Sequence, residues 1–328
     1  MVDSSLVKMI MPKQLEATVS TGPTTANLGP LFDIGGARLY GKKSGLYMET
    51  TGSWKPDKGL TIQSDGKYPL PTGEDNLAHK VAAKIFQEKE LEGGLALKFS
   101  NYMKPGGLGV SAAGAIAVVE IIDKIYGLNL TNEEKIMYAA AGEPQQHLDN
   151  VVPGIIGGIV ISSRIEGQAL PRYSRIMSPA NITPSLIVPL TINKKGGTAE
   201  ARGAVLDGLV YDRHEAVRLT ELSQLMAAGL KEDNFTKVWE SIVDYSRWKK
   251  SVTFVRNEAG VYQVDVNEVN RRLEQIVGKE SIVTPSGAGT ALLNLAADPA
   301  VAHRSRIAGE KILRDFNKPA DVFDTPFY

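Results

Sequence analysis

The sequence predicts a protein of mixed α-helices and β-strands organised in two domains. The chain of 328 residues is long enough for two domains of ordinary size. Its first third consists of short β-rich stretches separated by Gly, Pro, Asp and Lys, whereas apolar residues at helical spacing begin near Asn76. After Asn150 two further β-like stretches precede a mostly helical remainder, with a Pro-containing loop between them. We therefore expect one domain over 1–180 and a second over 181–328.

Composition and charge exclude several classes of protein. Lys and Arg together number 37, as do Asp and Glu, so no excess of positive charge favours nucleic acid or an anionic membrane as a partner. The absence of cysteine removes disulfides, thiolate nucleophiles and Cys-based zinc sites. No apolar run is long enough to span a membrane, and the four histidines are too scattered to make a metal cluster. We expect a cytoplasmic protein with a small-molecule substrate and a homodimer as the candidate assembly.

Local patterns predict the order of the elements. Asp75 or Asn76 can cap a helix, an apolar helix over 111–126 should end at Gly127, and Thr131 with Glu134 forms a capping-box pattern. Strands are expected at 17–22, 37–41, 45–52, 59–66, 95–102, 155–165, 185–192 and 281–284. Helices are expected to begin near 76 and 131 and to span 199–209, 214–229, 234–248 and 266–277, before a terminal α/β segment.

The stretch KPGGLGVSAAGA, residues 104–115, has the character of a phosphate-binding loop. Free N–H groups and the positive end of the dipole at a helix start bind phosphate well, and glycine lets the backbone approach the anion. Gly106, Gly107 and Gly109 before an apolar helix fit that use. The alternative is a strand-to-helix turn that needs glycine only for its dihedral angles.

Two nucleotide-binding motifs of other folds match only in part. GLGVSA satisfies the dinucleotide pattern GxGxxA, but that pattern requires a second strand ending in an acidic residue about 20 positions on. The acidic residues available, Glu120 and Asp123, fall inside the predicted helix. GARLYGK, residues 36–42, matches a Walker loop up to its lysine, but Lys43 occupies the hydroxyl position and a β-like stretch follows. Both interpretations are set aside.

An ordered set of motifs runs from Thr21 to Thr290. It comprises Pro23 to Gly29 followed by Phe32 and Asp33, the glycine loop, Glu143 with His147 to Val151 and Gly157-Gly158, Thr198 to Arg202, Arg247 in a helix, and Ser286 to Gly289. This set resembles the motifs of the GHMP kinases, the galacto-, homoserine, mevalonate and phosphomevalonate kinases, whose central motif is a proline, a short spacer and GLGSSAA. The flanking motifs are most similar to those of the members that phosphorylate homoserine.

The resemblance implies a two-domain α+β fold with ATP and substrate between the domains. The N-terminal domain would contain a left-handed βαβ unit and the C-terminal domain would be ferredoxin-like. The implied activity is ATP- and Mg2+-dependent phosphorylation of a small hydroxy compound, with homoserine as the expected acceptor. Threonine, pantoate or a mevalonate-type acid is the alternative acceptor, and a non-catalytic sensor of nucleotide or metabolite is the alternative class.

The resemblance also implies which residues bind the cofactors. The residues expected at the nucleotide are Pro105, Gly106, Gly107, Leu108, Gly109, Val110, Ser111, Ala112, Ser286, Gly287 and Gly289. Ser111 and Glu143 would hold Mg2+, which prefers oxygen ligands and usually takes one carboxylate along with phosphate oxygens and water. The chain departs from the family pattern in four places: Gly106 is the whole spacer, Val110 replaces the first serine, Pro30-Leu31 replaces a usual glycine, and Gln145 replaces a frequent glutamate.

Homoserine is a zwitterion with a free hydroxyl, so its site needs an acceptor for ammonium and a forked cation for carboxylate. The expected substrate residues are Asn27 and Asp33 on the ammonium side, Arg202 and Arg247 on the carboxylate side, and His147 at the carboxylate or the reacting end. Asp149 and Asn150 join Glu143 and Ser111 as expected catalytic residues. Asp149 is a site residue whose role stays open: it is the candidate general base, or the reaction needs no committed base, because in a loose transition state the hydroxyl can lose its proton to the phosphoryl group.

Overall fold

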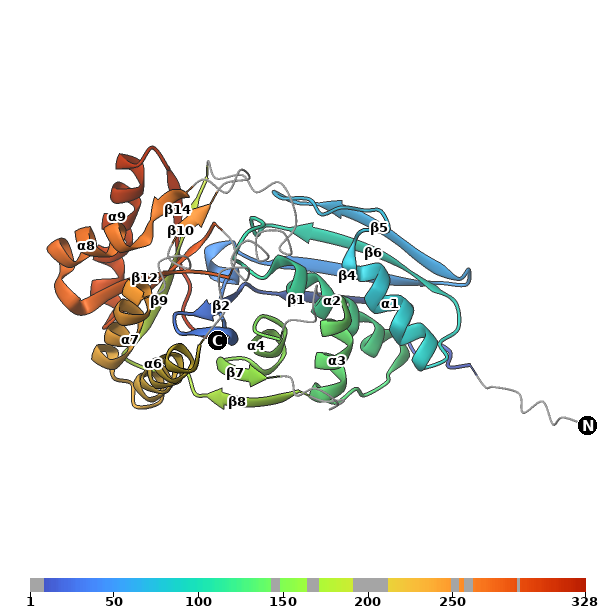
Figure 1. Cartoon of the computed structure of the whole chain (residues 1–328). Helices are drawn as coiled ribbons and strands as arrows, with labels where there is room; N and C mark the ends of the chain where they lie inside the picture. The colour runs from blue at the N-terminus through green and yellow to red at the C-terminus, as the bar shows by residue number, and fades with distance from the viewer. Residues whose placement is uncertain are drawn as a thin grey trace, which may run out of the picture.

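The computed structural model describes residues 9–142, 148–163, 171–190, 212–248, 254–256, 262–287 and 290–328. Within these residues the strands form three four-stranded sheets and one two-stranded ribbon (Figure 1). The first two sheets are built by strands that precede residue 180, and the third by strands that follow it. This pairing is compatible with a domain division near residue 180, which stays a prediction.

The first sheet has the order β1-β4-β6-β5 and contains a parallel βαβ unit. Its strands are β1 (Glu16–Thr21), β4 (Met48–Lys55), β5 (Gly59–Asp65) and β6 (Gly94–Asn101). Helix α1 (Leu77–Glu88) joins the parallel strands β5 and β6, and the Asn76 side chain accepts a hydrogen bond from the Ala78 N–H at 2.9 Å. The predicted N-cap is thereby confirmed, with Asn76 rather than Asp75 in that position.

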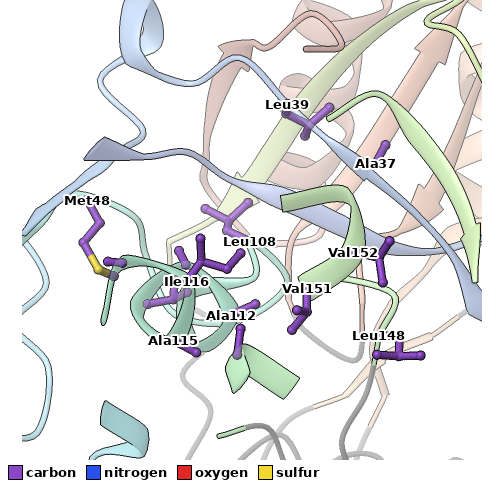
Figure 2. Packing of buried hydrophobic residues seen from close by; sticks show 14 of the residues in the cluster. Ala37, Leu39, Met48, Leu108, Ala112, Ala115, Ile116, Leu148, Val151 and Val152 are labelled. Atoms are coloured by element: carbon purple, nitrogen blue, oxygen red, sulfur yellow. The ribbon is translucent and has the colours of Figure 1, made fainter. Parts of the chain in front are cut away.

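Helix α2 (Val110–Tyr126) is the centre of the main core. It packs against β1, β4, α1, α3 (Asn132–Gly142) and α4 (Val151–Ile156), and 13 of its 17 residues are buried, as its apolar sequence predicts. Figure 2 shows Ala112, Ala115 and Ile116 of this helix turned toward the surrounding core side chains. The helix ends at Gly127, whose φ of 60° is the predicted left-handed cap.

The second sheet has the order β2-β3-β7-β8 and carries the N-terminal motif. Its strands are β2 (Thr24–Leu28), β3 (Leu31–Arg38), β7 (Ile159–Ser163) and β8 (Arg172–Ile176). Two boundaries differ from the sequence prediction: β3 begins well before residue 37, and the first part of the predicted strand at 155–165 is helical, because it belongs to α4. Neither α4 nor β8 was predicted.

The third sheet is antiparallel with the order β12-β13-β9-β14. It consists of β9 (Thr183–Pro189), β12 (Ser281–Pro285), β13 (Leu292–Ala296) and β14 (Ala320–Asp324), covered by α8 (Val266–Val277) and α9 (Pro299–Asp315). The sequence β9-α8-β12-β13-α9-β14 with this strand order is the ferredoxin-like arrangement. Helices α6 (Arg213–Lys231) and α7 (Phe235–Trp248) and the ribbon of β10 (Phe254–Arg256) and β11 (Tyr262–Asp265) are inserted between β9 and α8.

Short 3-10 turns complete the described elements, at η1 (Lys42–Ser44) and η4 (Gly278–Glu280). The helix predicted at 199–209 lies outside the described residues. Among the helices that are described, none combines the length and the apolar character needed to cross a bilayer.

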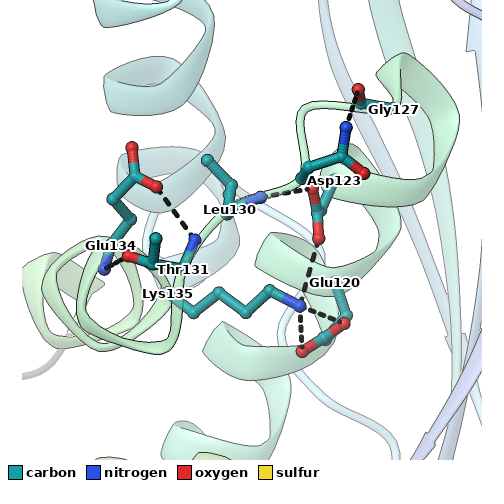
Figure 3. Close-up of polar contacts among 8 residues, drawn as sticks. Glu120, Asp123, Gly127, Leu130, Thr131, Glu134 and Lys135 are labelled. Atoms are coloured by element: carbon teal, nitrogen blue, oxygen red, sulfur yellow. Dashed lines mark hydrogen bonds and ion pairs between the residues drawn. The ribbon is translucent and has the colours of Figure 1, made fainter.

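A polar network ties the second half of α2 to α3 (Figure 3). Lys135 Nζ lies 3.0 Å from both Glu120 Oε1 and Asp123 Oδ2, and Asp123 Oδ1 accepts the Leu130 N–H at 3.0 Å. The predicted capping box is present, with the Thr131 N–H donating to Glu134 Oε2 and the Glu134 N–H to Thr131 Oγ1. The network therefore fixes the orientation of the helix whose N-terminus follows the glycine loop.

Replacing Lys135 by Met is expected to lower the free energy of unfolding by about 1–2 kcal/mol, because two partly buried carboxylates lose their cation. Burial alone would lower the pKa of Lys135, but the hydrogen bonds to Glu120 and Asp123 outweigh it and raise the pKa above 10.5. The stabilisation is thus complete at neutral pH and is lost only as the pH rises through that raised value.

Urea denaturation of the wild type and of Lys135→Met measures this loss of unfolding free energy. Lys84→Met is the control, because Lys84 pairs with Glu88 at the surface of α1 with both side chains more than a third exposed. Its cost should be about 0.3–0.5 kcal/mol. Equal costs for the two variants would contradict the structural role of the Lys135 network.

Candidate active site

Asn27 and Asp33 of the β2–β3 hairpin adopt backbone conformations that few side chains accept. Their φ angles are 59° and 64°, and the register of the hairpin shifts between Ala26 and Leu28. The Asp33 N–H donates to Asn27 Oδ1 at 2.8 Å, so this bond fixes the Asn27 side chain against the Asp33 backbone. Asn and Asp tolerate the left-handed region better than other residues with side chains. The structure thus brings together the two residues that were predicted for the ammonium side of the substrate.

The glycine loop leads from β6 into α2 through three glycines with positive φ. The angles are 113° at Gly106, 94° at Gly107 and 62° at Gly109, the N-cap of α2. No side chain in the described part of the chain caps this helix, and the first N–H to bond back is that of Ala113, to Gly109 O at 2.9 Å. The preceding N–H groups and the helix dipole therefore form an anion-binding surface.

The C-terminal glycine motif, which begins at Ser286, packs against the glycine loop that precedes α2. Ser286 Oγ donates to Gly107 O at 2.5 Å and lies 2.8 Å from Thr25 Oγ1, while the Gly287 N–H donates to Ala26 O at 3.0 Å. A Cβ on Gly107 would lie 2.3 Å from Ser286 O, so only glycine fits there. Ser286 and Gly287 therefore hold the loop in position, and their role as direct nucleotide ligands stays a prediction.

Thr24 joins the glycine loop to the Asp149-Asn150 pair. Thr24 Oγ1 donates to Asn150 Oδ1 at 2.8 Å, and a Cβ on Gly109 would lie 1.9 Å from the same hydroxyl oxygen. Asn150 also occupies the N-cap position of α4. Asp149 is 1% exposed, and its backbone oxygen lies where a Cβ on Gly36 would come within 1.6 Å. Residues far apart in sequence thus meet at one end of α2.

Two predicted residues, Ser111 and Arg247, make fewer contacts. Ser111 is the second residue of α2 and is half-buried at the start of the helix. Arg247 lies near the end of α7 with its side chain 70% exposed and 3.9 Å from Asp244. Its neighbour Ser246 lines a small cavity together with Asn27, which places this end of α7 beside the hairpin. Their functional roles stay predictions.

Four predicted residues lie outside the described residues: Glu143, His147, Arg202 and Gly289. In the parts of the chain that the structure does describe, no three His, Asp or Glu side chains gather into a metal site. The hydroxyl of Ser111 at the helix start is of the oxygen-donor type that Mg2+ accepts.

A cavity of about 240 Å3 adjoins the glycine loop. Lys104 and Leu108 of the loop line it together with Tyr68 and Tyr102, and Tyr102 stacks on Tyr47 with ring centroids 4.9 Å apart. Nothing in the sequence pattern indicated it, because its aromatic residues come from separate turns. A larger cavity of about 650 Å3 lies between α1 and β5, and its lining includes none of the predicted site residues.

Lys104 links the loop to the third sheet. Its Nζ donates to Pro189 O at 2.6 Å and to Leu190 O at 3.0 Å, at the end of β9. Burial lowers the pKa of Lys104, and the charge of Asp321 opposes that shift. This lysine therefore connects the start of the loop to the C-terminal half of the chain.

Comparison with known proteins identifies relatives of this chain. Residues 76–158 match the family model of the GHMP kinases N terminal domain. The chain is 29% identical over 238 residues to the homoserine kinase of Halalkalibacterium halodurans, covering 72% of this chain and 71% of the relative. It is 32% identical over 219 residues to the homoserine kinase of Bacillus thuringiensis, covering 67% and 66%. With the homoserine kinase of Methanopyrus kandleri the identity is 32% over 196 residues, covering 58% and 60%.

Solved structures share the fold over almost the whole chain. The homoserine kinase of Cytophaga hutchinsonii superposes with a TM-score of 0.76 at 21% identity, covering 96% of both chains. The mevalonate kinase of L. major, solved with R-mevalonate, gives a TM-score of 0.69 at 16% identity, covering 97% of this chain and 98% of that one. At these identities the structures establish the fold alone, and they confirm the predicted two-domain α+β class.

The chain belongs to the GHMP kinase family. It is an ATP-dependent kinase that acts on a hydroxyl group of a small molecule. Within that family it resembles the homoserine kinases, as its flanking motifs predict.

Proposed function

We propose that the protein is a homoserine kinase, which transfers the γ-phosphoryl group of ATP to the side-chain hydroxyl of L-homoserine. The product, O-phospho-L-homoserine, is an intermediate of threonine biosynthesis. The observation that carries the proposal is the 2.8 Å hydrogen bond from the Asp33 N–H to Asn27 Oδ1, which brings the two residues together. The bond fixes the backbone from which the Asp33 carboxylate extends, and a carboxylate there suits an acceptor with an ammonium group. The names of the curated relatives support the same acceptor.

The nucleotide is proposed to lie with its phosphates at the start of α2. The N–H groups that precede Ala113 and the helix dipole supply the attraction. The cavity lined by Tyr68 and Tyr102 adjoins the loop and offers aromatic side chains for stacking, so it is the candidate site for the base. Its lining also includes the charged residues Lys67, Lys104 and Asp321. Mg2+, when bound, neutralises charge on the phosphates, and Ser111 with Glu143 are the residues that would hold it.

The acceptor is proposed to bind beside the β2–β3 hairpin. Asp33 and Asn27 take the ammonium group, Arg202 and Arg247 the carboxylate, and His147 the carboxylate or the hydroxyl end. Phosphoryl transfer depends mainly on alignment and charge neutralisation. Asn150 serves that alignment, because its amide oxygen accepts a hydrogen bond from Thr24 and its amide NH2 group is the donor it can offer to the substrate or the phosphate.

No proton-transfer step is assigned to Asp149. A loose transition state allows the hydroxyl to pass its proton to the transferred phosphoryl group. The burial of Asp149 and the close packing of its backbone oxygen on Gly36 suit a residue that fixes the segment carrying Asn150.

Release of ADP with four acceptors tests the proposal. Purified protein is assayed with MgATP and, in parallel, L-homoserine, L-threonine, pantoate and mevalonate, and the phosphorylated product is identified by mass spectrometry. We expect kcat/KM for homoserine to exceed that for mevalonate by about 10²-fold, since Asp33 attracts an ammonium group and repels a bare acid. If pantoate or mevalonate is turned over faster than homoserine, homoserine is not the acceptor, and the assignment to the GHMP kinase family still stands. No stimulation by any of the four would favour a sensor.

A further inference from the structure

Thr290 carries a buried hydroxyl group without a hydrogen-bond partner. The residue is 2% exposed, and its Oγ1 forms no hydrogen bond with any of the described residues. Buried polar groups are nearly always paired, and an unpaired one costs stability, so its presence calls for an explanation. Thr50 and Thr325 have hydroxyls in the same state, so burial alone does not set Thr290 apart.

Thr290 is set apart by its position against the glycine loop. A Cβ on Gly106 would lie 3.0 Å from Thr290 Oγ1 and 3.5 Å from the Thr290 nitrogen, so the hydroxyl points at the place where Gly106 lacks a side chain. The backbone joins the two segments through a hydrogen bond from the Ala291 N–H to Gly106 O at 3.2 Å. Gly106, with φ of 113°, therefore covers the hydroxyl, while the neighbouring Gly107 is the residue that Ser286 holds.

The loop itself offers few hydroxyl donors. In the stretch from Lys104 to Ala115, Ser111 is the one residue with a hydroxyl group, and Val110 precedes it at the helix start. A hydroxyl that donates to a charged phosphate oxygen forms a stronger bond than one that donates to a neutral acceptor. A second hydroxyl beside the loop would add such a bond.

We propose that Thr290 is a phosphate-binding residue, whose Oγ1 donates to a phosphate oxygen of the nucleotide once the loop shifts at Gly106. The inference rests on the proposed position of the nucleotide at the glycine loop. Without nucleotide the hydroxyl stays unpaired, and with nucleotide it gains its partner. Part of the binding free energy of the nucleotide then comes from pairing this group.

Isothermal titration with the Mg2+ complex of a non-hydrolysable ATP analogue tests the proposal, together with the melting temperature of the unbound protein. Thr290→Val keeps the shape of the side chain and removes the hydroxyl. We expect its unbound melting temperature to equal or exceed that of the wild type, and its Kd to rise about tenfold, or ~1.4 kcal/mol. Thr290→Ser keeps the hydroxyl and should bind like the wild type.

The control is Thr50→Val, which removes an equally buried and unpaired hydroxyl from β4. It should leave the Kd unchanged. An unchanged Kd in Thr290→Val would overturn the proposal, and so would a Kd that rises equally in Thr50→Val. If Thr290→Val does not fold, Thr290→Ala and Thr290→Ser are compared instead. A Kd about tenfold higher for Thr290→Ala than for Thr290→Ser supports the proposed role, and equal Kd values overturn it.

The same titration separates this proposal from the one on which it rests. If the wild type binds the nucleotide and Thr290→Val binds equally well, the role of Thr290 is wrong and the kinase assignment stands. If Gly109→Ala, which disrupts the loop, binds as tightly as the wild type, the nucleotide lies elsewhere and both proposals fail.

Discussion

Gly109→Ala is expected to lower kcat/KM for ATP by about 10²-fold, the usual consequence of misplacing a binding group by 1 Å. A Cβ at this position would lie 1.9 Å from Thr24 Oγ1 and 3.0 Å from Asn150 Oδ1. Thr24 cannot easily turn away, because it is β-branched and its N–H also donates to Leu108 O at 3.2 Å. The loop must therefore move, and the N–H groups at the start of α2 move with it.

Gly127→Ala is the matched control, since it changes the glycine at the other end of the same helix. Its φ of 60° is close to the 62° of Gly109, so the backbone strain of an alanine is similar. The new Cβ would meet the flexible end of the Lys13 side chain, which can move aside. Steady-state kinetics should show little change in this variant despite a loss of stability of about 1 kcal/mol. Similar kinetic losses in both variants would mean that strain, and not the displaced loop, is responsible.

Asp33→Asn is expected to lower kcat/KM for homoserine by about 10²-fold while leaving the Kd for nucleotide unchanged. The substitution removes the negative charge proposed to hold the substrate ammonium, and losing one partner of a desolvated charge pair costs about 2–5 kcal/mol. Asn keeps the left-handed backbone at φ of 64°, and the backbone N–H that donates to Asn27 remains. The Asp33→Asn variant therefore tests the role of the Asp33 negative charge without changing the backbone of the hairpin.

The same change at Asp233 provides the control. Asp233 is also in the left-handed region, with φ of 55°, and it accepts hydrogen bonds from Ala180 and Asn181 far from the glycine loop in sequence. Asp233→Asn should leave kcat/KM for homoserine at the wild-type level. An Asp33→Asn enzyme that keeps its homoserine activity would remove Asp33 from the ammonium site.

Elements with local signals could be predicted from the sequence, and elements held by distant contacts could not. Helix α2 was predictable because an apolar segment ends at Gly127, and α1 because Asn76 caps it. Helix α4 was missed because VVPGII contains proline and glycine, both poor helix formers, and its stability comes from packing against α2 and α3. Strand β3 was shortened because Gly35 and Gly36 weaken strand propensity, although Asp149 O leaves room only for glycine at Gly36.

The candidate site shows the same division. Its motif residues could be named, because the order of the motifs carries the resemblance to the family. The residues that hold them could not be named: Thr25 contacts Ser286 across 261 positions, and Thr24 contacts Asn150 across 126. Thr290 directly follows the Ser286–Gly289 motif, but only its burial against Gly106 distinguishes it from an ordinary turn residue.

Strand β2 makes the spacing of its motif as important as its composition. Thr24 and Thr25 are consecutive, so their side chains leave opposite sides of the strand, one toward Asn150 and the other toward Ser286. Removing a single residue from this strand would invert that arrangement and turn each hydroxyl toward the other's partner. An insertion or deletion here should therefore be tolerated less than almost any exchange of one side chain for another.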